Sequence, residues 1–312
     1  MPFSIESNLE WRKSPDADGV MIGEAMRDGP TVGIIGGIHG DEFSGIVIAD
    51  LIPKSLSVDF GRVIVMHGNL DAIAIEKRQS NPDNPEANLN RWFRDLTDEE
   101  KLRDGGELPS EANRAQELMG HIDMCDAILD LHEFEDPNGT PFIITERDSL
   151  ATAQAIGPEV IALGFAEAEP GGTDGYGYEN EIEALCYELG PMGKQFTAKN
   201  VKYAKGAVNR FLAAQALLRQ GMAAKLPPLH DNPMLVQVDK DSPYIRVGDT
   251  FEMERDFTSF ERLKRGELLA TDYGKEIRSS EDVDQVMVFP KPKATPPKKG
   301  REAFELGEIV TE

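Results

Sequence analysis

Residues 31–42, TVGIIGGIHGDE, set the expected architecture of this chain. An apolar β-branched run that stops at two glycines is typical of a buried strand followed by a tight turn. The turn presents His39 and Glu42, which are three residues apart. If a helix begins at Asp41, these two side chains share one helix face and can point at a common centre. Imidazole nitrogen and carboxylate oxygen are both zinc ligands, so the turn predicts half of a metal site.

The His39–Glu42 pair alone leaves two interpretations open. The spacing H-x-x-E also arises by chance, most often on a solvated helix surface. It is neither H-E-x-x-H nor H-x-x-E-H, because Phe43 follows Glu42. A metal site therefore needs a third ligand from another part of the chain.

Composition excludes several classes of function. A chain of 312 residues can bury a substantial core in one or two domains. Its formal net charge of -23 opposes binding to nucleic acid or to an anionic membrane surface. No apolar stretch approaches the roughly 20 residues of a membrane-spanning helix, and the N-terminus lacks a hydrophobic signal core. We therefore expect a cytoplasmic protein. Its two cysteines make no disulfide framework.

The order of apolar patterns predicts an α/β fold. Short buried runs alternate with helical patterns from residue 31 to residue 220, which indicates a mainly parallel sheet flanked by helices. After residue 225 the pattern changes to short alternating runs separated by Gly, Asp and Pro, which is typical of β-structure. We expect an α/β domain at 1–224, which would carry any active site at its sheet edge, and a small all-β domain at 225–312.

Two further strands end in chemically useful side chains. The runs 126–132 (DAILDLH) and 184–190 (ALCYELG) present His132 and Glu188 near their carboxyl ends. Ligands of parallel α/β sheets bind at that edge of the sheet. A carboxylate in so apolar a run is costly unless it has a partner or a role. His39, Glu42, His132 and Glu188 are therefore expected to converge.

Two segments suggest how a substrate could be held. Asn90 and Arg91 suit the binding of a carboxylate, because Arg offers a planar fork and Asn a neutral donor. The alternative is an ordinary Arg paired with nearby acids, and the residues favour neither. The glycine- and acid-rich stretch 167–183 predicts a mobile loop near the site.

Together these motifs resemble the succinylglutamate desuccinylase/aspartoacylase family of zinc carboxypeptidase-like, M14-type hydrolases. The resemblance rests on GGIHGDE at 36–42, NLNR at 88–91, DLH at 130–132 and YELG at 187–190. The β-rich tail is similar to the small C-terminal domain of that family. Two positions depart from the family pattern, with Leu70 in place of a proline and Asn88 in place of an aspartate.

The resemblance implies a function and a set of site residues. The reaction would be hydrolysis of the amide bond of a small N-acyl amino acid. One zinc ion per chain would be bound by His39, Glu42 and His132, with Glu188 as general base and acid. Arg78 would stabilise the oxyanion, and Asn90 and Arg91 would hold the substrate carboxylate.

The substrate is less defined than the chemistry. No Arg or Lys lies between Arg147 and Lys194, where the family's aspartoacylases carry an arginine shortly before the catalytic glutamate. This argues against a second acidic group on the substrate, and the acidic 167–183 segment favours a cationic or neutral side chain. A carboxypeptidase-like peptidase and a non-catalytic binding protein on the same fold are the alternatives. The sequence leaves a homo-oligomer open.

Overall fold

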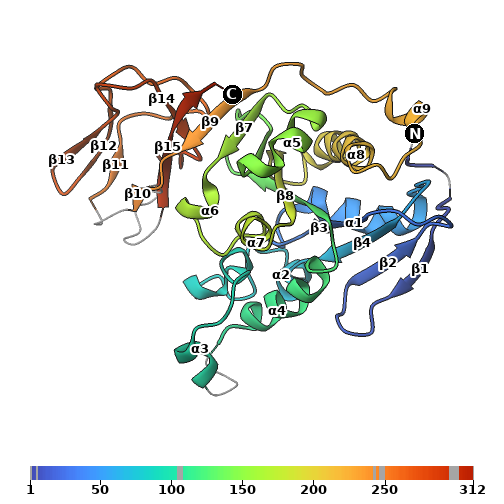
Figure 1. Ribbon diagram of the computed structural model, residues 1–312. Helices are drawn as coiled ribbons and strands as arrows, with labels where there is room; N and C mark the ends of the chain where they lie inside the picture. The colour runs from blue at the N-terminus through green and yellow to red at the C-terminus, as the bar shows by residue number, and fades with distance from the viewer. Residues whose placement is uncertain are drawn as a thin grey trace.

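A mixed sheet is the framework of the molecule, as the computed structural model shows (Figure 1). Twelve strands of the described residues form this sheet, and three more form a small separate sheet. The structure describes residues 2–4, 6–103, 108–241, 244–245, 250–294 and 302–311.

Four parallel strands occupy the centre of the large sheet. β3 (Thr31–Gly36) lies between β4 (Arg62–His67) and β5 (Ala127–Phe134). β8 (Glu183–Pro191) runs parallel to β5 on its other side. Nearly every residue of these strands is buried, which explains why they read as continuous apolar runs.

Strands of both directions extend the sheet on either side. The strand order is β1-β2-β4-β3-β5-β8-β6-β7-β9-β15-β10, and β14 pairs with β15. The further members are β1 (Glu10–Lys13), β2 (Val20–Glu24), β6 (Phe142–Thr145), β7 (Val160–Leu163), β9 (Met234–Val238), β10 (Tyr244–Ile245), β14 (Gln285–Val288) and β15 (Glu302–Val310). The separate sheet contains β11 (Glu252–Met253), β12 (Leu268–Asp272) and β13 (Lys275–Arg278). The predicted fold class, a mainly parallel mixed sheet with C-terminal β-structure, is confirmed.

Helices cover both faces of the central strands. Successive strand residues point to opposite faces, so Ile34 and Ile35 enter two different apolar cores. On one face the core is closed by α1 (Phe43–Ser55), α5 (Leu150–Ile156) and α8 (Thr197–Ala214). On the other it is closed by α4 (Ser110–Ile122) and α7 (Thr173–Glu179). The shorter helices are α2 (Leu70–Ile75), α3 (Asp98–Leu102), α6 (Phe165–Ala168), α9 (Gln220–Ala223) and the 3-10 turns Pro85–Ala87, Leu89–Arg91 and Arg147–Ser149.

The prediction of a mobile loop at 167–183 is wrong in part. The segment contains the end of α6 and all of α7, and residues 173–177 are buried. Tyr176 packs in a core and donates to Asp123, while the Thr173 hydroxyl donates to Asp130. These contacts anchor a stretch whose glycine and acid content resembles that of a loop.

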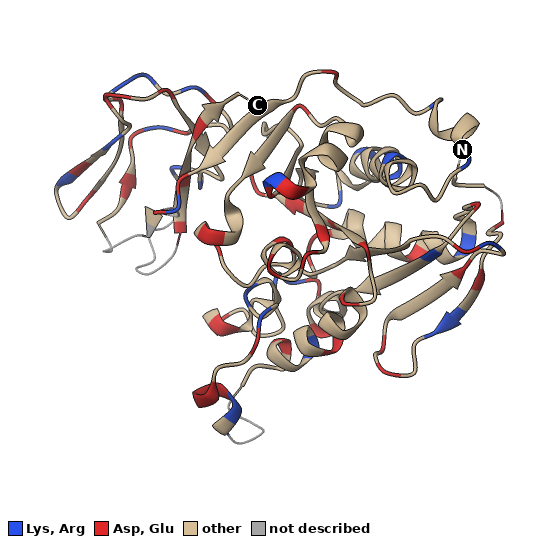
Figure 2. Ribbon diagram, viewed as in Figure 1, with Lys and Arg blue, Asp and Glu red and all other residues tan. Residues whose placement is uncertain are grey.

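The C-terminal strands join the central sheet. β9 pairs with β7 and β15 pairs with β9, so the main sheet runs past residue 225. The division into domains at 224/225 stays a prediction. Asp and Glu are spread over helices, strands and loops of both regions (Figure 2). Within the described ranges, every helix is too short or too polar to span a bilayer.

The close approach of α1 to β3 sets the position of the turn that carries His39 and Glu42. A Cβ atom on Gly36 would lie 2.2 Å from the carbonyl oxygen of Gly45 in α1. Such an approach leaves no room for a side chain. The helix therefore begins close to the end of the strand.

We expect Gly36→Ala to destabilise the protein by about 1–3 kcal/mol, because the new methyl group must push α1 away from β3. Gly120→Ala in α4 is the matched control, since no atom lies within 4 Å of its Cβ position. It should be neutral or stabilising by up to about 1 kcal/mol. Denaturant unfolding of both variants measures the difference. Equal stability of Gly36→Ala and the wild type would contradict the packing described.

Candidate active site

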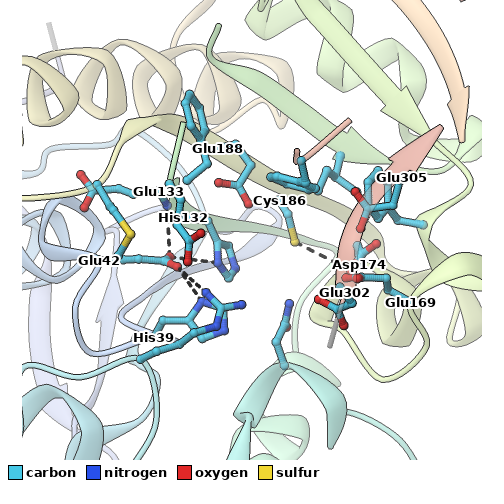
Figure 3. Close-up of a pocket in the computed structure, with 18 of the residues that line it drawn as sticks. His39, Glu42, His132, Glu133, Glu169, Asp174, Cys186, Glu188, Glu302 and Glu305 are labelled. Carbon is cyan, nitrogen blue, oxygen red and sulfur yellow. Dashed lines mark hydrogen bonds and ion pairs between the residues drawn. The ribbon is translucent and has the colours of Figure 1, made fainter. Parts of the chain in front are cut away.

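A pocket opens at the carboxyl ends of three adjacent parallel strands. His39 follows β3, His132 lies in β5 and Glu188 lies in β8. All three line the pocket, as does Glu42, the residue that precedes α1 (Figure 3). The structure therefore brings together the four residues that the sequence predicted to converge.

The carboxylate of Glu42 lies between the two imidazoles. Its Oε1 is 2.7 Å from Nδ1 of His39, and its Oε2 is 3.2 Å from Nδ1 of His132. The two rings are 5.4 Å apart between centroids. One ligand atom from each of the three residues lies within 4.8 Å of the others, which is the arrangement of a metal-binding group.

The outer nitrogen of each imidazole meets an oxygen that accepts a hydrogen bond. Nε2 of His132 is 2.8 Å from Asp130 Oδ2, and Nε2 of His39 is 3.1 Å from Asn88 Oδ1. A proton held on Nε2 by these oxygens would leave each Nδ1 free to bind a metal ion beside the Glu42 carboxylate. Two imidazole nitrogens and a carboxylate that converge in a buried space favour a positive charge between them, supplied by a proton or by a metal ion. Two histidines and one carboxylate suit zinc, with a further coordination position left for water or substrate.

The electrostatics of the cluster agree with that requirement. Burial alone would raise the pKa of Glu42, but the two imidazoles outweigh burial and hold that pKa well below its usual range. Burial lowers the pKa of His132, but Asp130 and Glu42 outweigh it and raise that pKa well above the ordinary value. Burial and the nearby Arg78 lower the pKa of His39 to about 4. The ionised Glu42 and Asp130 therefore favour positive charge at His132, which a proton or a bound metal ion can supply.

Glu188 is a buried carboxyl group on the same wall of the pocket. It is the cross-strand neighbour of His132, and Figure 3 shows the two residues side by side. Its Oε2 has no hydrogen-bond partner within the described part of the chain. Burial raises the pKa of Glu188 to about 8, with Glu42 adding to the rise and His132 opposing it. A carboxyl group with such a pKa can take up and release a proton near neutral pH.

The predicted substrate-binding residues also line the pocket. Arg78 is 48% exposed, and its Nη1 lies 3.4 Å from Glu42 Oε1. Asn90 Oδ1 accepts a hydrogen bond from the backbone N–H of Thr173. Arg91 Nη2 lies 2.7 Å from Glu169 and 3.4 Å from Glu302. Arg91 thus has acidic partners in this structure, and its contact with a substrate carboxylate stays a prediction.

Several pocket residues escaped the sequence analysis. Glu133 follows His132, and its carboxylate accepts hydrogen bonds from Ser44 and Asn200 while its backbone N–H donates to Glu42. Glu302 and Glu305 come from β15, which is distant in sequence from every motif. The position of Glu133 next to His132 was a usable signal. Nothing in the local sequence marks the two glutamates of β15.

A profile of the succinylglutamate desuccinylase/aspartoacylase catalytic domain matches residues 28–215, which is more than half of the chain. The chain belongs to this family. Family membership indicates hydrolase activity on a small molecule. The matched range contains His39, Glu42, His132 and Glu188.

Several solved structures share the fold over nearly the whole chain. The succinylglutamate desuccinylase of Vibrio parahaemolyticus is 18% identical, with 97% of this chain and 91% of that chain covered and a TM-score of 0.69. The succinylglutamate desuccinylase/aspartoacylase of Rhodobacter sphaeroides is 18% identical, with coverage of 97% and 95% and a TM-score of 0.66. The ectoine utilization protein EutE (DoeB) of Ruegeria pomeroyi, a product-bound structure, is 20% identical, with coverage of 97% and 99% and a TM-score of 0.67.

Replacing Asp130 with Asn tests the orientation of His132. The amide can turn its NH₂ group toward Nε2, which would leave the His132 ring in the wrong tautomer. We expect zinc affinity to fall by roughly 10- to 100-fold, as measured by competition with a chelator of known affinity. Asp126→Asn is the control, because Asp126 precedes the same strand but accepts from the backbone of Thr31. An Asp130→Asn protein with wild-type affinity would remove Asp130 from this role.

Proposed function

We propose that this chain is a zinc-dependent amidohydrolase that cleaves the amide bond of a small N-acyl amino acid. The products are a carboxylic acid and a free amino acid. The observation that carries the proposal is the convergence of His39, Glu42 and His132 beside the buried Glu188. Membership of a family named for two deacylases supports it.

His39, Glu42 and His132 are the residues that would hold one zinc ion per chain. A bound zinc ion supplies Lewis acidity, which polarises the scissile carbonyl group and lowers the pKa of water in the site. Asp130 and Asn88 hold the two imidazoles in the orientation that this requires. The backbone N–H of Glu133 fixes one oxygen of Glu42.

Glu188 is the proposed proton carrier. It accepts a proton from the attacking water as the new C–O bond forms. It then delivers a proton to the leaving nitrogen as the C–N bond breaks, so that the amine departs neutral. The raised pKa of Glu188, a result of burial, suits a group that must hold this proton between the two steps.

The arginines and Asn90 are proposed to position and stabilise the substrate. Arg78 Nη1 lies 3.4 Å from Glu42 Oε1, and Arg78 would stabilise negative charge on the carbonyl oxygen. Asn90 and Arg91 would bind the carboxylate of the amino acid and so fix the reacting geometry. Arg91 has five N–H donors, so it can keep its bond to Glu169 while it binds a further oxygen.

The walls of the pocket favour a small substrate over a peptide chain. The C-terminal region contributes four pocket-lining residues, which are Phe289, Lys291, Glu302 and Glu305. Figure 3 shows Glu302 and Glu305 on the side of the pocket opposite His39 and Glu42. A wall at that position limits the length of chain that can extend from the scissile bond.

Replacing Glu188 with Gln should lower kcat by at least about 100-fold, because the amide cannot carry the proton. Zinc content should remain one ion per chain, as measured by elemental analysis. Hydrolysis is followed by amine release from N-acetyl amino acids with acidic, neutral and basic side chains.

The control for that variant is Glu183→Gln at the start of the same strand, where the carboxylate bonds to Thr152 and Gln215. Its zinc content and rate should match the wild type. An active Glu188→Gln enzyme would exclude Glu188 as the proton carrier. A wild-type protein that binds no zinc, or that hydrolyses none of the substrates, would exclude the proposed function itself.

A further inference from the structure

Three glutamates lie at the end of the pocket far from the candidate metal ligands. Glu169 follows α6, and Glu302 and Glu305 belong to β15. Figure 3 shows the three together, across the pocket from His39 and Glu42. We call them the acidic end of the pocket.

Glu305 is the member that structure alone does not explain. It is only 3% exposed, and it lines the pocket. Its Oε2 has no hydrogen-bond partner among the residues that the structure describes. Burial, Glu169 and Glu302 raise the pKa of Glu305 well above its usual value, and a cation bound beside this oxygen would favour the ionised form.

The cations of the pocket do not balance the acidic end. The Lys and Arg side chains among the described lining residues are Arg78, Arg91 and Lys291. Arg91 pairs with Glu169 and Glu302, and Lys291 lies 3.1 Å from Glu135. Arg78 contacts Glu42 at the other end. Lys291 and Arg91 both act on Glu305, but burial and the two neighbouring glutamates outweigh them and raise its pKa well above the usual value.

A purely structural role accounts for only part of this arrangement. Arg91 joins the 3-10 turn Leu89–Arg91 to α6 and β15 through Glu169 and Glu302, which explains those two glutamates. It gives Glu305 Oε2 no hydrogen-bond partner among the described residues. A second cation, bound in the pocket beside Glu305, would give that oxygen a partner.

The apolar part of the pocket lining suits an aliphatic side chain that ends in a charge. Phe165, Phe289 and Ile144 line the same pocket. Methylene groups can pack against such residues while a terminal ammonium group reaches the carboxylates. This combination of apolar wall and acidic end fits a basic amino acid.

We propose that Glu302 and Glu305 bind the cationic side-chain group of the substrate. The preferred substrate is then an N-acyl derivative of a basic amino acid, and Arg91 is left to bind its carboxylate. This inference rests on the proposed function, because it names the substrate class of the same site. It concerns specificity and not the chemistry of cleavage.

The test compares substrates of nearly equal shape. The zinc-loaded enzyme is assayed with Nα-acetyl-lysine and Nα-acetyl-ornithine against the uncharged Nα-acetyl-norleucine and Nα-acetyl-norvaline. We expect kcat/KM to be at least about 10-fold higher for the basic members. Nα-acetylglutamate should be the poorest substrate. Equal values for lysine and norleucine derivatives would overturn the inference and leave the proposed function standing.

Two variants assign the preference to residues. Glu305→Gln and Glu302→Gln should each reduce the lysine-to-norleucine ratio of kcat/KM by about 10-fold. Glu308→Gln, an exposed glutamate of the same strand, is the control and should keep the wild-type ratio. A parallel loss for both substrates would indicate a structural role and overturn the inference. If Glu305→Gln fails to fold, Glu302→Gln decides, since its side chain is 43% exposed.

Calorimetry separates failure of the inference from failure of the proposed function. Nα-acetyl-lysine and Nα-acetyl-norleucine are titrated into zinc-loaded Glu188→Gln protein, with and without Glu305→Gln. Tighter binding of the lysine derivative that is lost with Glu305→Gln supports the cation site even if no substrate is hydrolysed. Equal binding of the two compounds overturns it.

Discussion

The carboxylate of Glu42 between two imidazoles is the interaction on which the site depends. Its oxygens face His39 and His132, and one of them also accepts the backbone N–H of Glu133. Each contact comes from a different place along β3, α1 and β5, so the carboxylate is held only when these elements are packed. The close contact of Gly36 with Gly45 makes this packing tight. A buried anion of this kind needs a positive charge beside it, and the two imidazole nitrogens are placed to bind the proton or metal ion that supplies it.

The pocket has two ends, and each of them favours a different positively charged group. The end with His39 and Glu42 favours a metal cation, and Arg78 stands beside it. The other end holds an excess of carboxylates around Arg91. A small molecule with a carbonyl group at one end and a cationic group at the other would complement both ends. This pattern is local, because the acidic residues of the whole chain are spread widely and carry no such information.

The sequence predicted the central strands and the site residues at their carboxyl ends. The strands at 31–36, 126–132 and 184–190 are buried on both faces, so they are apolar without interruption and easy to recognise. Parallel strands share one carboxyl edge, which is why His39, His132 and Glu188 could be expected to meet. The resemblance to a family supplied Arg78, which no pattern in the residues had marked.

Other features depend on tertiary contacts that local sequence does not encode. Glu305 reaches the pocket because β15 pairs with β9 and β14, and strand pairing over such distances leaves no local signal. The segment 167–183 is ordered because Thr173 bonds to the buried Asp130, a contact between residues 43 positions apart. Arg91 was expected to meet either a substrate or neighbouring acids, and its acidic partners come from two distant segments.

The most direct test of the account is anomalous diffraction at the zinc absorption edge from crystals grown with one equivalent of zinc. We predict one strong peak per chain, bounded by Nδ1 of His39, a carboxylate oxygen of Glu42 and Nδ1 of His132. The carboxyl group of Glu188 should lie close to the zinc ion without coordinating it. A peak at any other group of residues, or no peak in protein shown to be folded and mixed with zinc, would contradict the account.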